Sequence, residues 1–364
     1  METNTDNWRP SGNVGEWSEL YVLSKLIADG GAFGTNDGNL RSQSDFCDVL
    51  EIFLSGNSTN RESRFKVKLD VTQIFVGDSL VSEVSRSAIG SLCDGFFNEI
   101  IATDHGSTFE SSFGKTLLTE LCRLSPSASS AQRASDLELI LIDRWSGSPT
   151  PHVGFSIKSQ IGSPSTLLNA SGATNFEFEI IAPHGVNPIA LTKESINSVQ
   201  VTVKKLLQNG CEFRFHKMSS ASFSQNLQML DSLMVENVAS LLINFYGSEE
   251  SRVDKVSHLS FPQKDPGSVQ KIFKIKQFLG AVAMGLRPSG VWDGDISKFK
   301  GMIVVKKNGD VILYYVHNLT QFQEFLFESV KFEVGSTSRH KFGKVYSSEG
   351  RYFIKLNLQI RFMM

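Results

Sequence analysis

The segment that most limits the fold spans residues 136–162 and reads DLELILIDRWSGSPTPHVGFSIKSQIG. Two apolar runs with β-branched and aromatic residues flank a turn that is rich in Gly, Pro and Ser, a pattern typical of a β-hairpin. We therefore expect an antiparallel hairpin over residues 136–161, which requires a β-sheet in the middle of the chain.

The hairpin carries polar side chains where an ordinary core strand would be apolar. Asp136 stands at the start of the first strand, and Ser156, Lys158 and Gln160 share one face of the second strand because alternate side chains point the same way. Hydrolysis of a phosphodiester with Mg²⁺ requires hard oxygen ligands and a cation that stabilises the attacking water and the developing negative charge. An acid and a lysine on paired strands meet both requirements.

A purely structural explanation of these residues is also open. A lysine in a strand is usually a solvent-facing or edge residue, and an aspartate before a strand is usually a turn or capping residue. Glu138 shares the face of Asp136, whereas Asp143 lies seven residues along the strand, roughly 23 Å away. We therefore rank Asp143 below Asp136 and keep Glu138 as a second metal ligand.

Length, composition and charge describe an ordinary globular chain. Its 364 residues, 40% hydrophobic and 20% charged, suffice for two domains. The net charge of −2 hides an asymmetry, since acids predominate in residues 1–60 and bases in residues 331–364, which suggests that one end faces a polyanion. No apolar run reaches the roughly 18 residues of a membrane span and no signal peptide is evident, so we expect a cytoplasmic protein without membrane contact.

The cysteines and histidines argue against a site for a soft metal. Cys47, Cys93, Cys122 and Cys211 form no CxxC pair, and the seven histidines show no HExxH spacing. We expect core thiols rather than disulfides or a zinc site.

The rest of the chain predicts a mixture of helices and strands. The expected elements are helices over 15–29, 44–56, 81–101, 109–123, 192–210 and 319–329, a helix-rich section up to about 285, strands over 64–77 and 176–181, and hairpins at Asn308-Gly309 and Glu349-Gly350.

Four sequence blocks resemble one protein family. They read GEWSELY, GFSIKSQIGSPSTLLNASGATNF, STSRHKFG and KLNLQIRF, and they span nearly the whole chain. The blocks are similar to those of the HpaII family of type II restriction endonucleases, and the hairpin resembles the PD-(D/E)xK nuclease core. This resemblance implies sequence-specific, Mg²⁺-dependent cleavage of double-stranded DNA, with unmethylated CCGG as the target of the family's namesake.

The resemblance also implies the roles of individual residues. It implies that Asp136 is a metal ligand and that Lys158 is the cation that positions or activates the water. It further implies an acid from the preceding helix, for which Glu19 is the first choice and Glu16, one turn away, is the alternative.

The sequence departs from the superfamily pattern at Ser156, where a Glu or Asp is expected. A serine offers one neutral oxygen and cannot balance the charge of Mg²⁺. Gln160 lies on the same face, and its amide oxygen could instead orient the water or a phosphate.

Three segments are candidate DNA contacts. Hydroxyl and amide groups after the catalytic strand suit phosphates and base edges, although this segment could be a solvated loop. These residues are Ser163, Ser165, Thr166, Asn169 and Asn175. The basic C-terminal segment adds Ser338, Arg339, His340 and Lys341. Arg339 is the candidate for guanine recognition, with a backbone phosphate as the alternative contact, and the lysines of VQKIFKIKQF could follow the DNA backbone or form a solvated helix face.

These expectations together predict an α/β (mixed α+β) protein with a PD-(D/E)xK-type core. We expect a helical N-terminal region (1–95) that contributes the first core helix, a nuclease core (96–220) and a C-terminal α+β DNA-recognition region (221–364). The expected partners are double-stranded DNA, a cognate DNA methyltransferase and a second copy of the chain on DNA. The neutral Ser156 motivates the alternative function, a sequence-specific DNA-binding protein with a degenerate, inactive nuclease site.

Overall fold

The computed structural model describes the chain in ten segments. These are residues 8–34, 45–56, 60–103, 108–127, 135–142, 147–162, 164–193, 198–294, 299–315 and 319–363. The chain forms two compact units, unit 1 (Met1–Ser165 and Ile296–Asn318) and unit 2 (Thr166–Asp295 and Leu319–Met364). The predicted boundaries at 95/96 and 220/221 both fall inside a unit.

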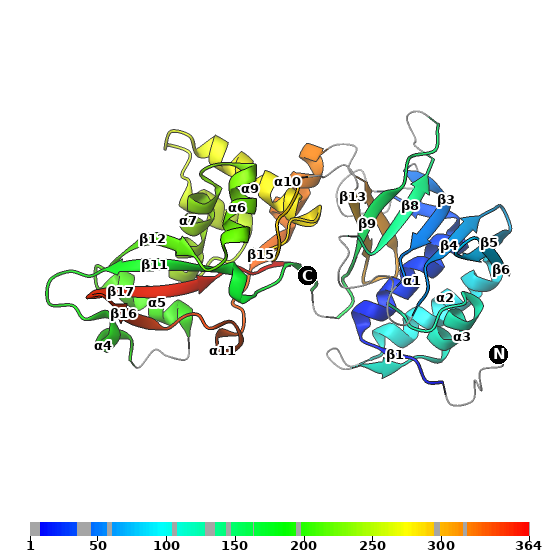
Figure 1. Cartoon of the computed structure of the whole chain (residues 1–364), viewed down its shortest axis with the longest axis horizontal. Helices are drawn as coiled ribbons and strands as arrows, with labels where there is room; N and C mark the ends of the chain where they lie inside the picture. The colour runs from blue at the N-terminus through cyan, green and yellow to red at the C-terminus, as the bar shows by residue number, and fades with distance from the viewer. Residues whose placement is uncertain are drawn as a thin grey trace. The chain divides into compact units, whose positions relative to one another are not determined.

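The chain is a mixture of helices and strands, as the fold class predicted (Figure 1). The helices are α1 (Val14–Asp29), α2 (Arg86–Ile101), α3 (Ser112–Glu120), α4 (Pro188–Thr192), α5 (Val199–Gln208), α6 (Ala221–Leu230), α7 (Met234–Gly247), α8 (Val253–Ser260), α9 (Ser268–Ala283), α10 (Leu319–Ser329) and α11 (Thr337–His340), with a 3₁₀ turn at Gly172–Thr174. Among the described helices, none has both the length and the apolar character needed to cross a membrane.

The strands belong to both units. In unit 1 they are β1 (Ser11–Gly12), β2 (Gly31–Phe33), β3 (Phe46–Leu54), β4 (Ser63–Val67), β5 (Val71–Val76), β6 (Ser79–Ser85), β7 (Phe109–Glu110), β8 (Leu137–Leu141), β9 (Val153–Ser159), β13 (Phe299–Val305) and β14 (Val311–Tyr315). In unit 2 they are β10 (Thr166–Leu168), β11 (Asn175–Ile181), β12 (Glu212–Met218), β15 (Val330–Phe332), β16 (Val345–Ser348), β17 (Arg351–Asn357) and β18 (Ile360–Phe362).

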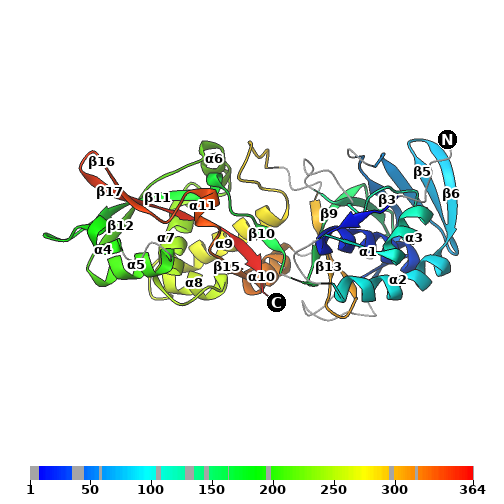
Figure 2. The ribbon, with the colours of Figure 1, turned by 90° about the horizontal axis from the view of Figure 1, so that it is seen from below.

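A large sheet organises unit 1. Within the described residues it has nine strands in the order β2-β14-β13-β9-β8-β3-β4-β5-β6, and β2 also pairs with β3. Helices α1, α2 and α3 lie together on one side of these strands (Figures 1 and 2). The sheet therefore has one face covered by α1, and the predicted hairpin β8–β9 lies near its middle.

Helix α1 forms where the sequence predicts it, because both of its ends are capped. The side chain of Asn13 accepts the backbone N–H of Glu16 (3.0 Å), and the side chain of Glu16 accepts the backbone N–H of Asn13 (2.8 Å). The helix ends at Gly30, whose φ of 72° lies in the left-handed region that favours glycine. Glu16 is thus part of a capping box.

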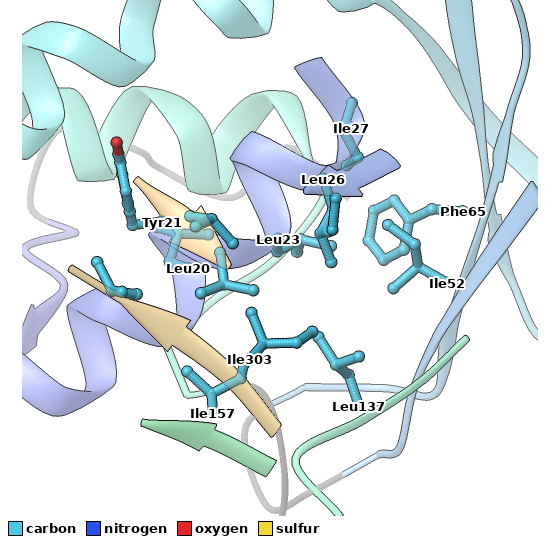
Figure 3. Packing of buried hydrophobic residues seen from close by; sticks show 14 of the residues in the cluster. Leu20, Tyr21, Leu23, Leu26, Ile27, Ile52, Phe65, Leu137, Ile157 and Ile303 are labelled. Carbon is cyan, nitrogen blue, oxygen red and sulfur yellow. The ribbon is translucent and has the colours of Figure 1, made fainter. Parts of the chain in front are cut away.

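The core of unit 1 lies between α1 and the sheet. Leu20 and Leu23 of α1 face Ile303 and Ile157 of neighbouring strands, and Leu26 lies beside Phe65 and Ile52 (Figure 3). This packing directs the odd-numbered side chains of β9 inward, as the alternation in the sequence predicted. The face with the polar side chains is consequently turned away from α1.

The predicted helix over residues 44–56 is wrong, because this segment is strand β3. Val49 and Ile52 are buried three positions apart, which mimics helical spacing. In the structure a register shift between Val49 and Glu51 produces that spacing within a strand. The sequence from 81 to 85 is likewise part of strand β6, and α2 begins only at Arg86.

The N-terminal region is therefore not mainly helical. Residues 64–77, predicted as one strand, form the hairpin β4–β5, and both strands extend the sheet of unit 1. The predicted helix over 109–123 is shorter, as α3, and the one over 192–210 is seen as α5, with residues 194–197 outside the described part of the chain.

The hairpin predicted at Asn308-Gly309 is confirmed as β13–β14. Gly309 has a φ of 87°, which the turn requires. The sequence does not predict that β13 pairs in parallel with β9, with Val304 beside Lys158. The hairpin β13–β14 thus extends the sheet beyond β9.

Unit 2 contains two smaller sheets. Its described strands form a four-stranded sheet, β12-β11-β17-β16, and a three-stranded sheet, β10-β18-β15. Helices α5, α7 and α8 lie on one side of β11 and β17 (Figure 2). The predicted hairpin at Glu349-Gly350 is confirmed, since both residues have a positive φ, 50° and 73°, between β16 and β17.

The cysteines agree only in part with the prediction of core thiols. Cys93 and Cys211 are buried and Cys47 is half-buried, but Cys122 is exposed, so the prediction is wrong for that residue. All four lie in the described part of the chain, and none of them is in a disulfide.

Trp17 is the residue whose loss should destabilise unit 1 most. It is fully buried, its Nε1 donates to the Phe109 carbonyl (3.1 Å), and its ring meets Phe96 edge-on at 5.8 Å. We expect Trp17→Ala to lower the free energy of unfolding by about 3–5 kcal/mol, because it leaves a cavity between α1, α2 and β7. Urea denaturation would measure this loss, and a change below about 1 kcal/mol would contradict the packing described here.

Candidate active site

The register of the β8–β9 hairpin places Asp136 opposite Ser156. Leu137 pairs with Phe155 in the antiparallel ladder, and one position earlier the backbone N–H of Asp136 donates to the Phe155 carbonyl (2.9 Å). The carboxylate oxygen Oδ2 of Asp136 accepts the backbone N–H of Ile157 (2.6 Å). The acid is therefore fixed to the strand that carries Lys158.

The side chains on the two faces of strand β9 have different surroundings. Phe155 and Ile157 belong to the core beneath α1, and the next side chain on this face, Ser159, accepts a hydrogen bond from Ser18 of α1 (2.9 Å). Lys158 points to the opposite face. The structure thus gives the alternation that the sequence predicted.

Ser156 and Lys158 differ in their surroundings. Ser156 is 8% exposed, and its Oγ has no hydrogen-bond partner among the described residues. The side chain of Lys158 is half-buried, and within the same set of residues no hydrogen bond or ion pair of its Nζ is found. Gln160 is also half-buried, and its backbone N–H donates to the Val305 carbonyl (2.8 Å). A buried oxygen and an amine therefore lie two positions apart beside Asp136.

This oxygen-rich end of the hairpin suits Mg²⁺ better than a soft metal. In the described part of the chain, no three His, Cys, Asp or Glu side chains gather closely enough to hold a metal ion. Mg²⁺ does not require such a group, because it keeps several waters and is usually bound through one or two carboxylates and the phosphates of a substrate. The carboxylate of Asp136 and the unpartnered Oγ of Ser156 fit that donor set.

The candidate acids of α1 have other interactions. Glu16 belongs to the capping box. Glu19 is half-buried, and its charge acts on Arg123, a 3% exposed arginine after α3. Burial lowers the pKa of Arg123 to about 10, and the negative charge of Glu19 opposes this shift. Both acids of α1 therefore interact with other groups, and α1 covers the face of β9 opposite Ser156 and Lys158.

Glu138 lies next to a histidine. It pairs with Gly154 across the hairpin and with Phe53 of β3. Its Oε2 is 3.8 Å from Nδ1 of His152, whose ring stacks on Phe53 at a centroid distance of 4.1 Å. Glu138 thus lies on the hairpin, and its carboxylate is near the ring of His152. Asp143, the lower-ranked acid, lies outside the described residues.

The predicted DNA contacts after β9 differ in their exposure where the structure describes them. Ser163 lies outside the described residues, Ser165 and Thr166 are half-buried, and Asn169 is exposed. Asn175 is 3% exposed at the start of β11. Its burial is difficult to reconcile with direct contact to DNA.

The basic C-terminal segment forms the short helix α11 in unit 2. Ser338, Arg339 and Lys341 are exposed and His340 is half-buried. The side chain of Ser336 caps this helix by accepting the N–H of Arg339 (3.4 Å). The predicted DNA-binding residues of this segment, with Arg339 as the candidate base reader, therefore lie together on one short, largely exposed turn.

The lysines of α9 have partners within unit 2. Lys274 lies 3.5 Å from Asp231, Lys276 forms an ion pair with Glu324, and Lys271 lies over the ring of Phe261 at 5.2 Å. These contacts favour a role in packing the helices over contact with a DNA backbone.

Sequence reasoning missed a second lysine near β9. Lys306 follows β13 and continues the face of Val304, which pairs with Lys158. It is 9% exposed, its Nζ donates to the Tyr314 hydroxyl (2.8 Å), and burial lowers its pKa. The KKNGD hairpin was visible in the sequence, but only its pairing with β9 shows that Lys306 belongs beside the candidate site.

Comparisons with known proteins identify the family of the chain. The sequence profile described as HpaII restriction endonuclease matches residues 13–362. The type II restriction enzyme HpaII of Haemophilus parainfluenzae is 33% identical over 364 residues, which cover 97% of this chain and 99% of that enzyme. No solved structure gives a significant match. The resemblance found in the four sequence blocks is thereby confirmed, and the chain belongs to the HpaII restriction endonuclease family.

Proposed function

We propose that this restriction endonuclease hydrolyses phosphodiester bonds in both strands of DNA with Mg²⁺, at the site formed by Asp136, Ser156 and Lys158. The observation that carries the proposal is the register of the β8–β9 hairpin. This register places Asp136 opposite Ser156, whose buried Oγ has no hydrogen-bond partner among the described residues, and Lys158 lies two positions after Ser156. A PD-(D/E)xK-type core accounts for this combination, since it needs a metal-binding acid and a lysine on paired strands.

Each residue has a distinct role in this proposal. Asp136 and Ser156 would hold the ion, with Glu138 as a further carboxylate. When bound, Mg²⁺ supplies positive charge at the phosphate and lowers the pKa of a coordinated water. The amine of Lys158 donates to the attacking water or to a phosphate oxygen, where it stabilises the negative charge that develops. Gln160 orients the same water or an adjacent phosphate.

The target and the partners are proposed from family membership. We propose CCGG or a related sequence as the target, read in part by Arg339, because an arginine that binds guanine O6 and N7 is the commonest specific base contact. A cognate methyltransferase would protect the host's own sites, and a second copy of the chain on DNA would allow both strands to be cut. The basic, exposed α11 supports contact with DNA in unit 2.

A digest of DNA with known sequence tests the proposal. The purified protein should produce discrete fragments with Mg²⁺ and none with EDTA, and the fragment ends should identify both the target and the cut position. The alternative, a DNA-binding protein with an inactive site, predicts retention of specific duplexes without any fragments. That result would overturn the proposed chemistry while leaving the binding role intact.

Ser156 is the position at which the metal site can be varied. We expect Ser156→Ala to weaken cleavage about tenfold at limiting Mg²⁺, because it removes an oxygen opposite Asp136. Ser156→Asp should lower the Mg²⁺ concentration needed for half-maximal cleavage, because it adds the missing charge.

The matched control for both variants is Ser159→Ala on the other face of β9, which should leave the Mg²⁺ dependence unchanged. Full activity of Ser156→Ala at every Mg²⁺ concentration would transfer the ligand role to Gln160 or Glu138.

A further inference from the structure

Three segments far apart in the sequence meet in unit 2 around one buried side chain. Asn357, at the end of β17, directs its amide nitrogen towards three oxygens near the start of β11. These are the Ser171 carbonyl (2.8 Å), the Thr174 hydroxyl (3.0 Å) and the Asn175 side-chain oxygen (2.7 Å). The third segment is α11, which Asn175 reaches.

Asn175 continues the chain of hydrogen bonds to α11. While its oxygen accepts from Asn357, its nitrogen donates to the carbonyl of His340 (2.8 Å), the last residue of that helix. Directly after His340, Lys341 adopts a left-handed conformation with φ 54° and ψ 54°. The two asparagines thus form an amide relay, Asn357–Asn175, that ends at the turn carrying Arg339.

The relay is buried and firmly anchored. Asn357 is 0% exposed and Asn175 is 3% exposed. The hydroxyl of the fully buried Tyr246 in α7 donates to the Asn357 carbonyl (3.0 Å). By contrast, α11 is four residues long and none of its residues is buried. A helix this short does not persist by itself, so its position depends on the groups that bond to it.

The contribution of the relay to the stability of unit 2 does not by itself explain the relay. The side-chain oxygen of Asn357 has no hydrogen-bond partner among the described residues, and a buried unpaired acceptor is unfavourable. The ideal Cβ of Gly335, in the segment leading to α11, would lie 2.7 Å from Ala170 Cβ and 3.4 Å from this oxygen. The polar junction is therefore packed closely against the chain that enters α11.

We propose that the Asn357–Asn175 relay is a positioning device for base recognition, which holds the Arg339 turn in the orientation that discriminates between base pairs. This inference rests on the proposed role of Arg339 in reading guanine. Paired hydrogen bonds from one guanidinium to a base require a fixed backbone, because a small rotation of the turn breaks both bonds. Asn175 and Asn357 act through Arg339 and do not touch DNA.

The test measures discrimination by cleavage kinetics. It compares kcat/KM for a duplex with the mapped target with kcat/KM for the same duplex with one G·C pair changed. Asn175→Asp has nearly the same size and can still accept from Asn357, but its carboxylate cannot donate to the His340 carbonyl. We expect it to reduce the ratio roughly ten- to a hundredfold, chiefly through the target duplex. Asn357→Ala, a second variant, should act in the same direction.

Asn226→Ala provides the matched control. Asn226 is also 0% exposed in unit 2, and its amide nitrogen donates to the carbonyls of Arg287 and Gly290 (3.0 Å each), which holds a different loop. Thermal melting of all variants corrects for general destabilisation. The control should lower the melting temperature and leave the discrimination ratio unchanged, whereas the relay variants should lower the ratio when assayed well below their melting temperatures.

A double-mutant cycle with Arg339→Ala tests whether the relay acts through Arg339. If the relay acts through Arg339, adding Asn175→Asp to Arg339→Ala should cost little further discrimination. Additive losses, or full discrimination in both relay variants, would overturn the relay while Arg339 keeps its role. An unchanged ratio in Arg339→Ala itself would overturn both the proposed reading of guanine and the relay that serves it.

Discussion

Lys158→Met should abolish most DNA cleavage and leave DNA binding nearly intact. Methionine keeps the length and apolar stem of the side chain but removes the amine that stabilises negative charge during hydrolysis. The loss of one such group typically lowers the rate about 10²- to 10³-fold. Single-turnover cleavage of the target duplex measures the chemical step, and a gel-shift assay measures binding.

The control for this variant is Lys66→Met, which removes an exposed lysine from β4 in the same sheet. It should cut DNA at the normal rate. Equal rates for Lys158→Met and the unmodified enzyme would show that Lys158 is a structural residue, as many strand lysines are.

Asp136→Asn should produce a loss of similar size with a different dependence on metal. The amide oxygen of asparagine can still accept the N–H of Ile157, so the hairpin keeps its register, but the negative charge that attracts Mg²⁺ is removed. We expect cleavage to fall by more than about 100-fold and to be partly restored at high Mg²⁺ concentration.

A titration of cleavage rate against Mg²⁺ concentration distinguishes this variant from Lys158→Met, which should not respond to added metal. Asp78→Asn, in the exposed turn between β5 and β6, provides the control. A rate for Asp136→Asn that is low at every Mg²⁺ concentration, with altered thermal unfolding, would assign Asp136 to the structure of the hairpin instead.

Local patterns in the sequence were sufficient for the elements that are stabilised locally. The ends of α1 follow from Asn13 and Gly30, and the hairpin at Glu349-Gly350 follows from residues suited to a tight turn. Both signals lie within a few residues of the structure that they specify. Strand β3 was misread because a register shift gave a strand the spacing of a helix.

The candidate site was predictable only up to the limits of the hairpin. Asp136 and Lys158 could be paired from the sequence because a short connection joins their strands. The parallel neighbour β13 could not, because its partner lies more than a hundred residues earlier and no local pattern links the two strands. The position of Lys306 beside β9 could not be predicted for the same reason, because it depends on the pairing of β13 with β9. The burial of Asn175 depends on its contact with Asn357, which is distant in the sequence.

The pairing of β9 with β13 has a consequence for the order in which the sheet of unit 1 is completed during synthesis. During synthesis, the ribosome completes the β8–β9 hairpin early, but β13 emerges only after most of unit 2. Until then β9 is an open sheet edge without its parallel neighbour, and such an edge invites pairing with other chains. A chain that ends before residue 299 therefore lacks both the parallel neighbour of β9 and Arg339, the residue proposed to read a base.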